Sequence, residues 1–452
     1  MTTDVTSNNA ITISKITNSN GGSSGHSSNG STSTAQTVQN TVEVEVSVNG
    51  KTEAAAVTTT KVSDKTVTTI AIDDKNVQEK LQQEGNNAVV AIHGNSTADV
   101  TIGQLNGQTV KNMESKDAVL EIKAGNVIYT LPASQINIDN ISSQLGTQVD
   151  LKDVTVQVEI SKSDNQAATL VENLAKQGSF LIVVPPVDFN VKCVYGNKTV
   201  AVNNFSKYVE RLIEIPDGVD PAKITTGVIV DPDGTVRHVP TKIITVDGKY
   251  YAKINSLTNS SYSVIWNPKT FKDVEKHWAK SAVNDMGARL VISGVGKDMF
   301  EPDKDVTRAE FAAIIVRAMG LKPGIGDNQF KDVKSSDWYS GYVKTACDYK
   351  LISGYSADTF GPTDKISREQ AMTIIAKAMD ITGLKANEST NQMESFIDFV
   401  NAHAYAKTSI NACISTGVVS GKGKSLIAPK DNITRAEVAA IIQRLLQKSG
   451  LI

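Results

Sequence analysis

Hydrophobic and polar residues alternate along much of the chain between residues 39 and 268. In the clearest case, residues 41–48 read TVEVEVSV, with a valine at every second position and mostly glutamates between them. A period of two predicts a strand with one buried face and one face in water, as in antiparallel sheets. Asn49-Gly50 follows this run and is a favoured pair for a tight hairpin turn.

The same alternation, or a short run of β-branched residues, predicts further strands at 56–61, 66–72, 88–93, 118–123, 127–131, 151–161, 179–189, 225–240, 242–254 and 261–267. Asp247-Gly248 supplies another turn, and helical patterns occur at 73–84 and near 164–176. These elements predict a β-rich fold, sandwich-like with short helices. We divide it into two domains, 39–150 and 151–268. Residues 1–38, rich in Ser, Gly and Asn, are too polar to build a core and are interpreted as a disordered linker.

After residue 269 the apolar period changes to that of helices, and the sequence repeats three times. An aromatic residue precedes a glycine by 16 positions, and that glycine precedes an arginine by 14, in each repeat. The three series are Trp278, Gly294 and Arg308; Trp338, Gly354 and Arg368; and Tyr405, Gly421 and Arg435. Such spacing is typical of a repeat architecture. We place the repeats at 269–325, 326–384 and 393–452.

Each repeat carries the signals of two amphipathic helices. A Phe-x-Asp start (Phe271, Phe330 and Phe396) precedes the first helix, and its Asp is expected to cap the turn that follows. The helix runs to a Ser-Gly pair, whose glycine suits a left-handed position that stops it. The second helix begins at a capping box, in which a hydroxyl and a Glu or Gln three residues later cap each other's backbone. The boxes are Thr307 with Glu310, Ser367 with Gln370, and Thr434 with Glu437. No repeat can cover its own apolar stripe, so a pseudo-threefold all-α bundle is predicted.

Composition and charge argue against several classes of function. The formal net charge of −2 gives no general reason to bind nucleic acid, and no apolar run is long enough for a transmembrane segment. The three cysteines are too few and too scattered for a metal knuckle, so neither a metal nor another cofactor is expected. Asp231 and Asp233 are interpreted as turn residues rather than calcium ligands, because no spaced acidic partners follow them. Residues 39–267 show no catalytic motif.

No signal peptide is recognisable at the start of the sequence. Because the remainder has the character of an extracellular protein, we interpret the sequence as a fragment whose export signal lies upstream.

The repeats resemble S-layer homology (SLH) domains, which occur as triplets and anchor bacterial surface proteins. The resemblance covers residues 271–447 and is carried by the Phe-x-Asp start, the helix-opening Trp or Tyr, the Ser-Gly pair and the Thr-Arg-Ala-Glu box. It implies a three-pronged bundle with grooves between repeats. It also implies binding of secondary cell-wall polysaccharide, often pyruvylated and associated with peptidoglycan. By the same resemblance, the box arginines Arg308, Arg368 and Arg435 are expected to contact this polymer.

An arginine at the first position of a helix is a reasonable carboxylate ligand, because the guanidinium stands near exposed amides and the positive end of the helix dipole. Trp278, Trp338 and Tyr405 could stack on sugars or belong to the core. Gly294, Gly354 and Gly421 could contact polymer or only shape the backbone. In the second repeat Glu369 follows Arg368, which is expected to weaken anion binding there, so the grooves should differ.

The predicted function is therefore non-covalent anchoring of an extracellular protein to the bacterial cell wall, without catalysis. Two alternatives stay open for residues 39–267. This part could be a polysaccharide- or wall-active enzyme that the repeats tether, or a lattice, adhesin or scaffold region that contacts copies of itself or another protein.

Overall fold

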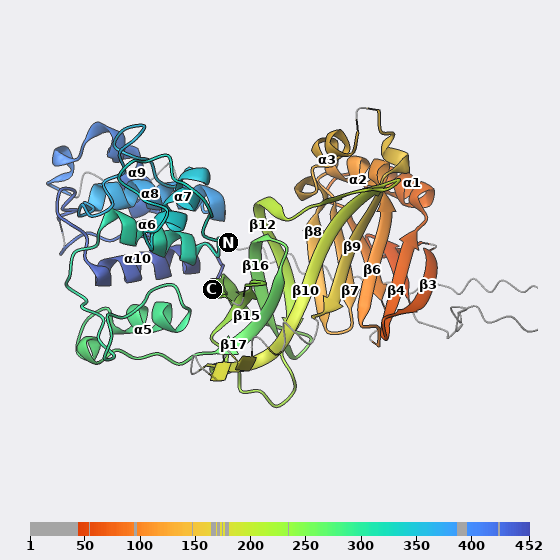
Figure 1. Cartoon of the computed structure of the whole chain (residues 1–452), viewed down its shortest axis with the longest axis horizontal. Coiled ribbons are helices and arrows are strands. Elements are labelled where there is room, and N and C mark those ends of the chain that lie inside the picture. The colour runs from red at the N-terminus through yellow and green to blue at the C-terminus, as the bar shows by residue number, and fades with distance from the viewer. Residues whose placement is uncertain are drawn as a thin grey trace, which may run out of the picture.

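The computed structural model describes residues 44–53, 55–94, 97–146, 148–163, 180–233, 235–386, 396–423 and 425–452, with a few more between 169 and 176. The predicted linker at 1–38 and most of the predicted helix near 164–176 lie outside these residues. The β-rich prediction for the first part of the chain is confirmed, because its strands form two sheets. The last part is helical, and Figure 1 shows its helices grouped at one end of the molecule.

The first sheet has the strand order β15-β16-β12-β8-β7-β5-β1-β2. Its strands are β1 (Glu45–Val48), β2 (Lys51–Thr52), β5 (Val89–Gly94), β7 (Val119–Ala124), β8 (Val127–Pro132), β12 (Asn204–Glu214), β15 (Thr241–Val246) and β16 (Lys249–Thr258). Only β5 and β7 pair in parallel. The predicted hairpin turns at Asn49-Gly50 and Asp247-Gly248 are present, and all four of these residues have positive φ, as tight hairpins need.

The second sheet has the order β14-β13-β17-β10-β9-β6-β4-β3, with β11 paired to β10. Its strands are β3 (Ala55–Val62), β4 (Lys65–Ile72), β6 (Val100–Asn106), β9 (Thr155–Lys162), β10 (Leu181–Tyr195), β11 (Lys198–Ala201), β13 (Thr226–Val230), β14 (Val236–Val239) and β17 (Ser261–Trp266). Helices α1 (Asp74–Glu84) and α2 (Gly107–Glu114) each connect one sheet to the other, and α3 (Ile138–Leu145) follows β8. Figure 1 shows these three helices together beside one end of the strands.

Both sheets continue across residue 150, where the sequence suggested a boundary between two domains. Strand β8 pairs with β12 in the first sheet, and β6 pairs with β9 in the second. One cluster of buried side chains also runs through both parts and receives residues from both sheets. Within it, the rings of Tyr129 and Phe189 lie 5.2 Å apart, edge to face. The two parts therefore share their sheets and their core.

Strand β12 was not predicted, because a charged residue occupies one of its inward positions. Val209, Arg211 and Ile213 alternate on the buried face, and Arg211 has no exposed surface. Its guanidinium lies 4.7 Å from the ring centroids of both Tyr129 and Tyr262. Aromatic faces attract a cation, so this arginine fills a core position that sequence patterning assigns to an apolar residue.

The six predicted helices of the repeats are present. They are α5 (Lys280–Ala288), α6 (Arg308–Ala318), α7 (Ser340–Asp348), α8 (Arg368–Thr382), α9 (Ala404–Ser415) and α10 (Arg435–Lys448). The main helix pairs join different repeats, since α6 packs on α7, α8 on α9, and α10 on α5. A single buried cluster contains apolar side chains from all three repeats. No repeat is therefore a folding unit with a core of its own.

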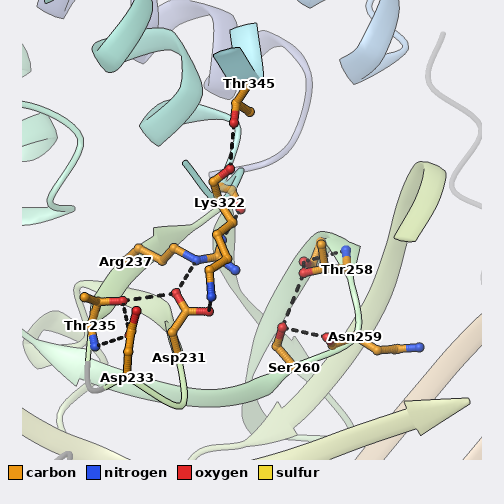
Figure 2. A network of polar contacts seen from close by, with 11 residues as sticks. Asp231, Asp233, Thr235, Arg237, Thr258, Asn259, Ser260, Lys322 and Thr345 are labelled. Carbon is orange, nitrogen blue, oxygen red and sulfur yellow. Dashed lines mark hydrogen bonds and ion pairs between the residues drawn. The ribbon is translucent and has the colours of Figure 1, made fainter. Parts of the chain in front are cut away.

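The helical part is bound to the β-rich part through a buried carboxylate. Asp231, at the end of β13, accepts hydrogen bonds from Arg237 Nε at 2.8 Å and from Lys322 Nζ, beyond α6, at 3.1 Å (Figure 2). Arg237 Nη1 also donates to the carbonyl of Gly320 at 2.6 Å. Elsewhere in the same contact, the Tyr208 hydroxyl donates to a carbonyl of the first repeat. The sequence interpretation of Asp231 as a plain turn residue missed this contact.

Candidate functional site

The segments that precede the three second helices meet and bind one another in a closed ring. The amide of Val306 donates to the carbonyl of Ile433, that of Ile433 to Ile366, and that of Ile366 to Val306, at 3.0 to 3.1 Å. Each repeat thus gives one hydrogen bond to a neighbour and receives one from the other neighbour. This ring holds the starts of α6, α8 and α10 close together.

Each second helix begins at a complete capping box. The hydroxyl of the residue just before the helix accepts a hydrogen bond from the backbone amide of the third helical residue. The side chain of this third residue accepts in turn from the backbone amide of the residue just before the helix. The pairs are Thr307 with Glu310, Ser367 with Gln370, and Thr434 with Glu437. The sequence fixes these caps locally, because all the partners lie within three residues.

The box arginine of each repeat reaches into the next repeat. Arg308 Nε donates to the carbonyl of Phe360 at 3.0 Å, and its Nη2 donates to the carbonyl of Ser353 at 2.9 Å. Both carbonyls belong to the second repeat, and Ser353 is part of its Ser-Gly pair. The guanidinium therefore occupies the interface between two repeats.

The other two arginines follow the same cyclic pattern. Arg368 Nε donates to the carbonyl of Ile427 in the third repeat at 2.8 Å. Arg435 Nε and Nη2 donate to the carbonyls of Phe300 and Ser293 in the first repeat, at 2.8 and 2.7 Å. All three guanidinium groups thus tie neighbouring repeats together.

These arginines are more enclosed than a solvated surface residue. Arg308 and Arg368 are only 4% and 3% exposed, and Arg435 is half-buried. Burial lowers the pKa of each guanidinium. Arginine is so strong a base that all three keep their charge at neutral pH.

The helix amides beside the arginines are already occupied. The amide of Arg308 donates to the carbonyl of Asp364 at 2.9 Å, and that of Ala309 donates to Pro362 at 3.1 Å. The next amide binds the cap hydroxyl, and the starts of α8 and α10 repeat this arrangement. The expectation that exposed amides would help to bind a carboxylate is therefore wrong. The loop of the neighbouring repeat takes the place of such a ligand.

The glycines of the Ser-Gly pairs do not have the left-handed conformation that the sequence suggested. The first helices end earlier, at Ala288, Asp348 and Ser415. The left-handed residue lies two positions after each end, at Leu290, Lys350 and Gly417, with φ of 63°, 57° and 71°. At Gly354, an added Cβ would lie 2.4 Å from the ring of Phe330 and 2.6 Å from two carbonyl oxygens. A glycine is required there because the Phe-x-Asp phenylalanine and a backbone loop pack directly on it.

The aspartates of the Phe-x-Asp starts bind a distant loop, not the turn that follows them. Asp273 accepts from the amides of Phe300 and Glu301 at 2.6 to 2.9 Å. Asp332 and Asp398 accept from the equivalent amides of their own repeats. The predicted local cap is wrong because folding brings a loop 27 or more residues away against the carboxylate. That loop also supplies the carbonyl that the arginine binds.

The helix-opening aromatics lie on the surface and not in the core. Trp278, Trp338 and Tyr405 are 63%, 59% and 56% exposed. An exposed aromatic ring offers an apolar face on which a partner can stack. Tyr405 also donates to Glu369 Oε1 at 3.3 Å.

Glu369 does not interact with the arginine beside it in the sequence. Its carboxylate is 2% exposed and is bound by His403 Nδ1 at 2.5 Å and Lys430 Nζ at 3.0 Å. Burial opposes ionisation, but these hydrogen bonds outweigh it, so the pKa of Glu369 is lowered. The acid that pairs with Arg368 is Glu437, at 2.9 Å.

In the part of the chain that the structure describes, no group of three or more His, Cys, Asp or Glu side chains could hold a metal ion. None of the described helices has both the length and the apolar character to cross a membrane. The β-rich part has a hollow of about 490 Å³ whose lining includes Asp99 and Glu214. Asp99 pairs with Lys162 at 3.1 Å, and Glu214 pairs with Lys249 at 2.6 Å.

The family model of the S-layer homology domain matches residues 270–312, 329–372 and 395–439. The C-terminal part of this chain therefore consists of three S-layer homology domains.

Three relatives align with parts of this chain. An amylopullulanase of Thermoanaerobacterium thermosulfurigenes is 29% identical over 361 residues, which cover 75% of this chain and 19% of the relative. A surface-layer 125 kDa protein of Lysinibacillus sphaericus is 30% identical over 173 residues, 38% of this chain and 14% of the relative. A cellulosome-anchoring protein of Acetivibrio thermocellus is 29% identical over 164 residues, 35% and 36% of the two chains. The chain thus spans only about a seventh to a third of these relatives.

Proposed function

We propose that the three SLH domains anchor this chain non-covalently to an acidic secondary cell-wall polysaccharide at a bacterial cell surface, without catalysis. The polymer would be one that carries carboxylates, such as pyruvate ketals, and that is associated with peptidoglycan. Relatives named as a surface-layer protein and a cellulosome-anchoring protein support the anchoring role. The ring of hydrogen bonds among the repeats supports a pseudo-threefold bundle with one groove at each interface.

The observation that carries this proposal is the repeated placement of an arginine at an interface between repeats. Two of its nitrogen groups are bound by carbonyls, which fixes the direction of the guanidinium. Among the described residues, Nη1 of Arg308 and Nη1 of Arg435 have no hydrogen-bond partner. A fixed guanidinium with one free edge binds a carboxylate at little entropic cost.

Several weak sites on one triplet suit a polymeric ligand. A chain of repeating sugars can occupy a second site without a further diffusional encounter, so retention on the wall can exceed the affinity of one site by a factor of about 100 or more. Exposed Trp278 and Trp338 offer apolar faces for sugar rings close to the helix starts. No bond is made or broken in this function.

The test is co-sedimentation of the purified chain with wall sacculi, before and after acid extraction of the secondary polymer. We expect binding to intact sacculi and loss of binding after extraction. The double variant R308A/R435A should sediment much less, whereas R444A, which removes a half-buried arginine of α10 that donates to the Ser420 hydroxyl, should behave as wild type. Helix content from circular dichroism must be unchanged in both variants. Retention of R308A/R435A at the wild-type level would refute the role of the arginines.

A polysaccharide-active enzyme in residues 39–267 is the second candidate. The alignment with the amylopullulanase covers 75% of this chain and so extends beyond the repeats. The hollow that contains Asp99 and Glu214 is the place to test, although both carboxylates are paired with lysines. Release of reducing sugar from starch, pullulan or wall polysaccharide, abolished in D99N or E214Q, would establish turnover. Equal rates with and without protein would exclude these substrates.

A further inference from the structure

The three arginine sites differ in the charge that faces each guanidinium, and the difference arises at one sequence position. The third residue of each second helix is Glu310, Gln370 or Glu437, and it closes the capping box of its own repeat. Each arginine reaches into the next repeat. Arg368 binds the capping glutamate there, Glu437, and the charge of Glu310 acts on Arg435. The capping residue at the equivalent position for Arg308 is the uncharged Gln370.

The charge of Arg368 is neutralised by a carboxylate of the protein itself. Its Nη1 donates to Glu437 Oε1 at 2.9 Å, and the arginine side chain is 4% exposed. Lys422 also lies 3.7 Å from Glu437 and 3.1 Å from Asp431, so cations and anions alternate here. A ligand carboxylate would have to displace a buried ion pair, which costs several kcal/mol when one partner is left unpaired.

The site of Arg435 is surrounded by acids. Burial lowers the pKa of Arg435, and the negative charges of Glu310, Glu301 and Asp273 oppose that shift. The same carboxylates that stabilise the charge of Arg435 repel an anionic ligand that approaches it. The residue after the Ser-Gly pair of the first repeat is Val295, which offers no aromatic face.

The site of Arg308 combines a less compensated charge with an exposed ring. Its guanidinium lies 4.2 Å from the ring centroid of Tyr355, which follows the Ser-Gly pair and is 53% exposed. Asp364 is the one carboxylate among the groups that act most strongly on the pKa of Arg308, and its backbone carbonyl is already bound by the start of α6. Arg308 has no ion pair among the described residues.

We infer that the Arg308 site is the one that accepts the acidic group of the polymer, and that the neutral side chain of Gln370 is the specificity determinant. The inference rests on the function proposed above. The guanidinium supplies the charge, and Tyr355 supplies the face against which the sugar ring packs. The Arg368 and Arg435 interfaces then bind no acidic group and join the repeats, while exposed Trp278 and Trp338 offer neutral sugars of the same polymer further places to pack.

Two reciprocal substitutions test this without removing a helix cap. Q370E and E437Q each place at one box the side chain that another box already uses, so both variants should fold. The probe is a methyl glycoside that carries a carboxyethylidene (pyruvate) ketal, with its methyl ester as the uncharged control. Binding to the full chain is followed by isothermal titration calorimetry, which gives both affinity and stoichiometry.

We expect wild type to bind one equivalent of the acid and not the ester. Q370E should weaken binding about tenfold or more, because it adds a negative charge at the position equivalent to that from which Glu437 binds Arg368. Y355A should weaken binding as well, whereas R368K, which keeps a positive charge opposite Glu437, should stay within about threefold of wild type. E437Q should expose the Arg368 guanidinium and raise the stoichiometry toward two.

Four outcomes decide the matter. Equal losses in R308K and R368K, or unchanged affinity in Q370E, would overturn the assignment to Arg308 while leaving wall binding intact. A wild-type stoichiometry of three would also overturn it. If the wild-type chain binds neither the probe nor intact sacculi, the proposed function fails, and the inference fails with it.

Discussion

Replacement of Asp231 by alanine should loosen the contact between the β-rich part and the repeats. The carboxylate is 6% exposed and receives hydrogen bonds from Arg237, itself 12% exposed, and from Lys322, which is 44% exposed (Figure 2). In D231A the charge of Arg237 stays largely buried and keeps only the carbonyl of Gly320 as a partner. Arg237 is therefore expected to turn outward or to remain unpaired.

The magnitude follows from the burial of each partner. Loss of one partner of a buried ion pair costs about 3–5 kcal/mol. The exposed Lys322 accounts for at most about 1 kcal/mol of this, because solvent screens its charge. We therefore expect D231A to lower the free energy of unfolding by about 3 kcal/mol or more and K322A by less than about 1 kcal/mol.

The assay is a urea titration followed by tryptophan fluorescence and by far-UV circular dichroism. Trp266 ends β17 next to Asn267, whose side chain donates to the carbonyl of Ala288 in the first repeat, and Trp278 lies in that repeat, so fluorescence reports the contact between the two parts. D233A is the matched control, since Asp233 lies in the same turn and its side chain binds Thr235 rather than Arg237 or Lys322 among the residues that the structure describes. A multidomain chain need not unfold in one step, so the two signals are compared transition by transition.

The reasoning would be refuted by equal effects of D231A and D233A, because the turn alone would then explain the loss. It would also be refuted if K322A matched D231A. In that case the screened lysine, and not the buried arginine, would carry the contact.

Three further predictions concern single buried groups. R211M should cost about 2–5 kcal/mol of unfolding free energy, measured in urea, because the carbonyls of Val209 and Thr258 and the side chain of Asn259 each lose a charged hydrogen-bond donor. A loss below about 1 kcal/mol would contradict this. Burial, with the nearby Arg289 charge, lowers the pKa of His238 to about 3. Below pH 6.5 the unfolded chain therefore binds a proton at this histidine that the folded chain excludes. The free energy of unfolding should fall by up to about 1.4 kcal/mol per pH unit toward pH 3. H238Q should flatten this slope between pH 6.5 and 5, and an unchanged slope would exclude His238 as its source. G354A should lower the melting temperature clearly, because the added Cβ overpacks against backbone that cannot move easily. S353A, at the exposed neighbouring position, should leave the melting temperature unchanged. Equal melting temperatures of the two variants would show that the loop relaxes.

The sequence by itself determined the elements that depend on neighbours a few residues away. Alternation over 41–48 and the Asn49-Gly50 pair are sufficient to predict a hairpin, because side-chain direction and turn conformation are local properties. The capping boxes, such as Thr307 with Glu310, span three residues and are equally readable. Repetition of these local signals also identified the three SLH domains before any contact between them was known.

Only the tertiary structure decided which distant groups meet. Asp273 binds amides 27 residues away, and Arg308 reaches carbonyls about 50 residues away, because the repeats close into a ring. Arg211 occupies a core position since aromatic rings from other strands surround it, which no pattern within its own strand reveals. Glu369 turns away from the adjacent Arg368 for the same reason: in a folded chain, charges pair with their nearest partners in space, and the sequence fixes only which partners exist.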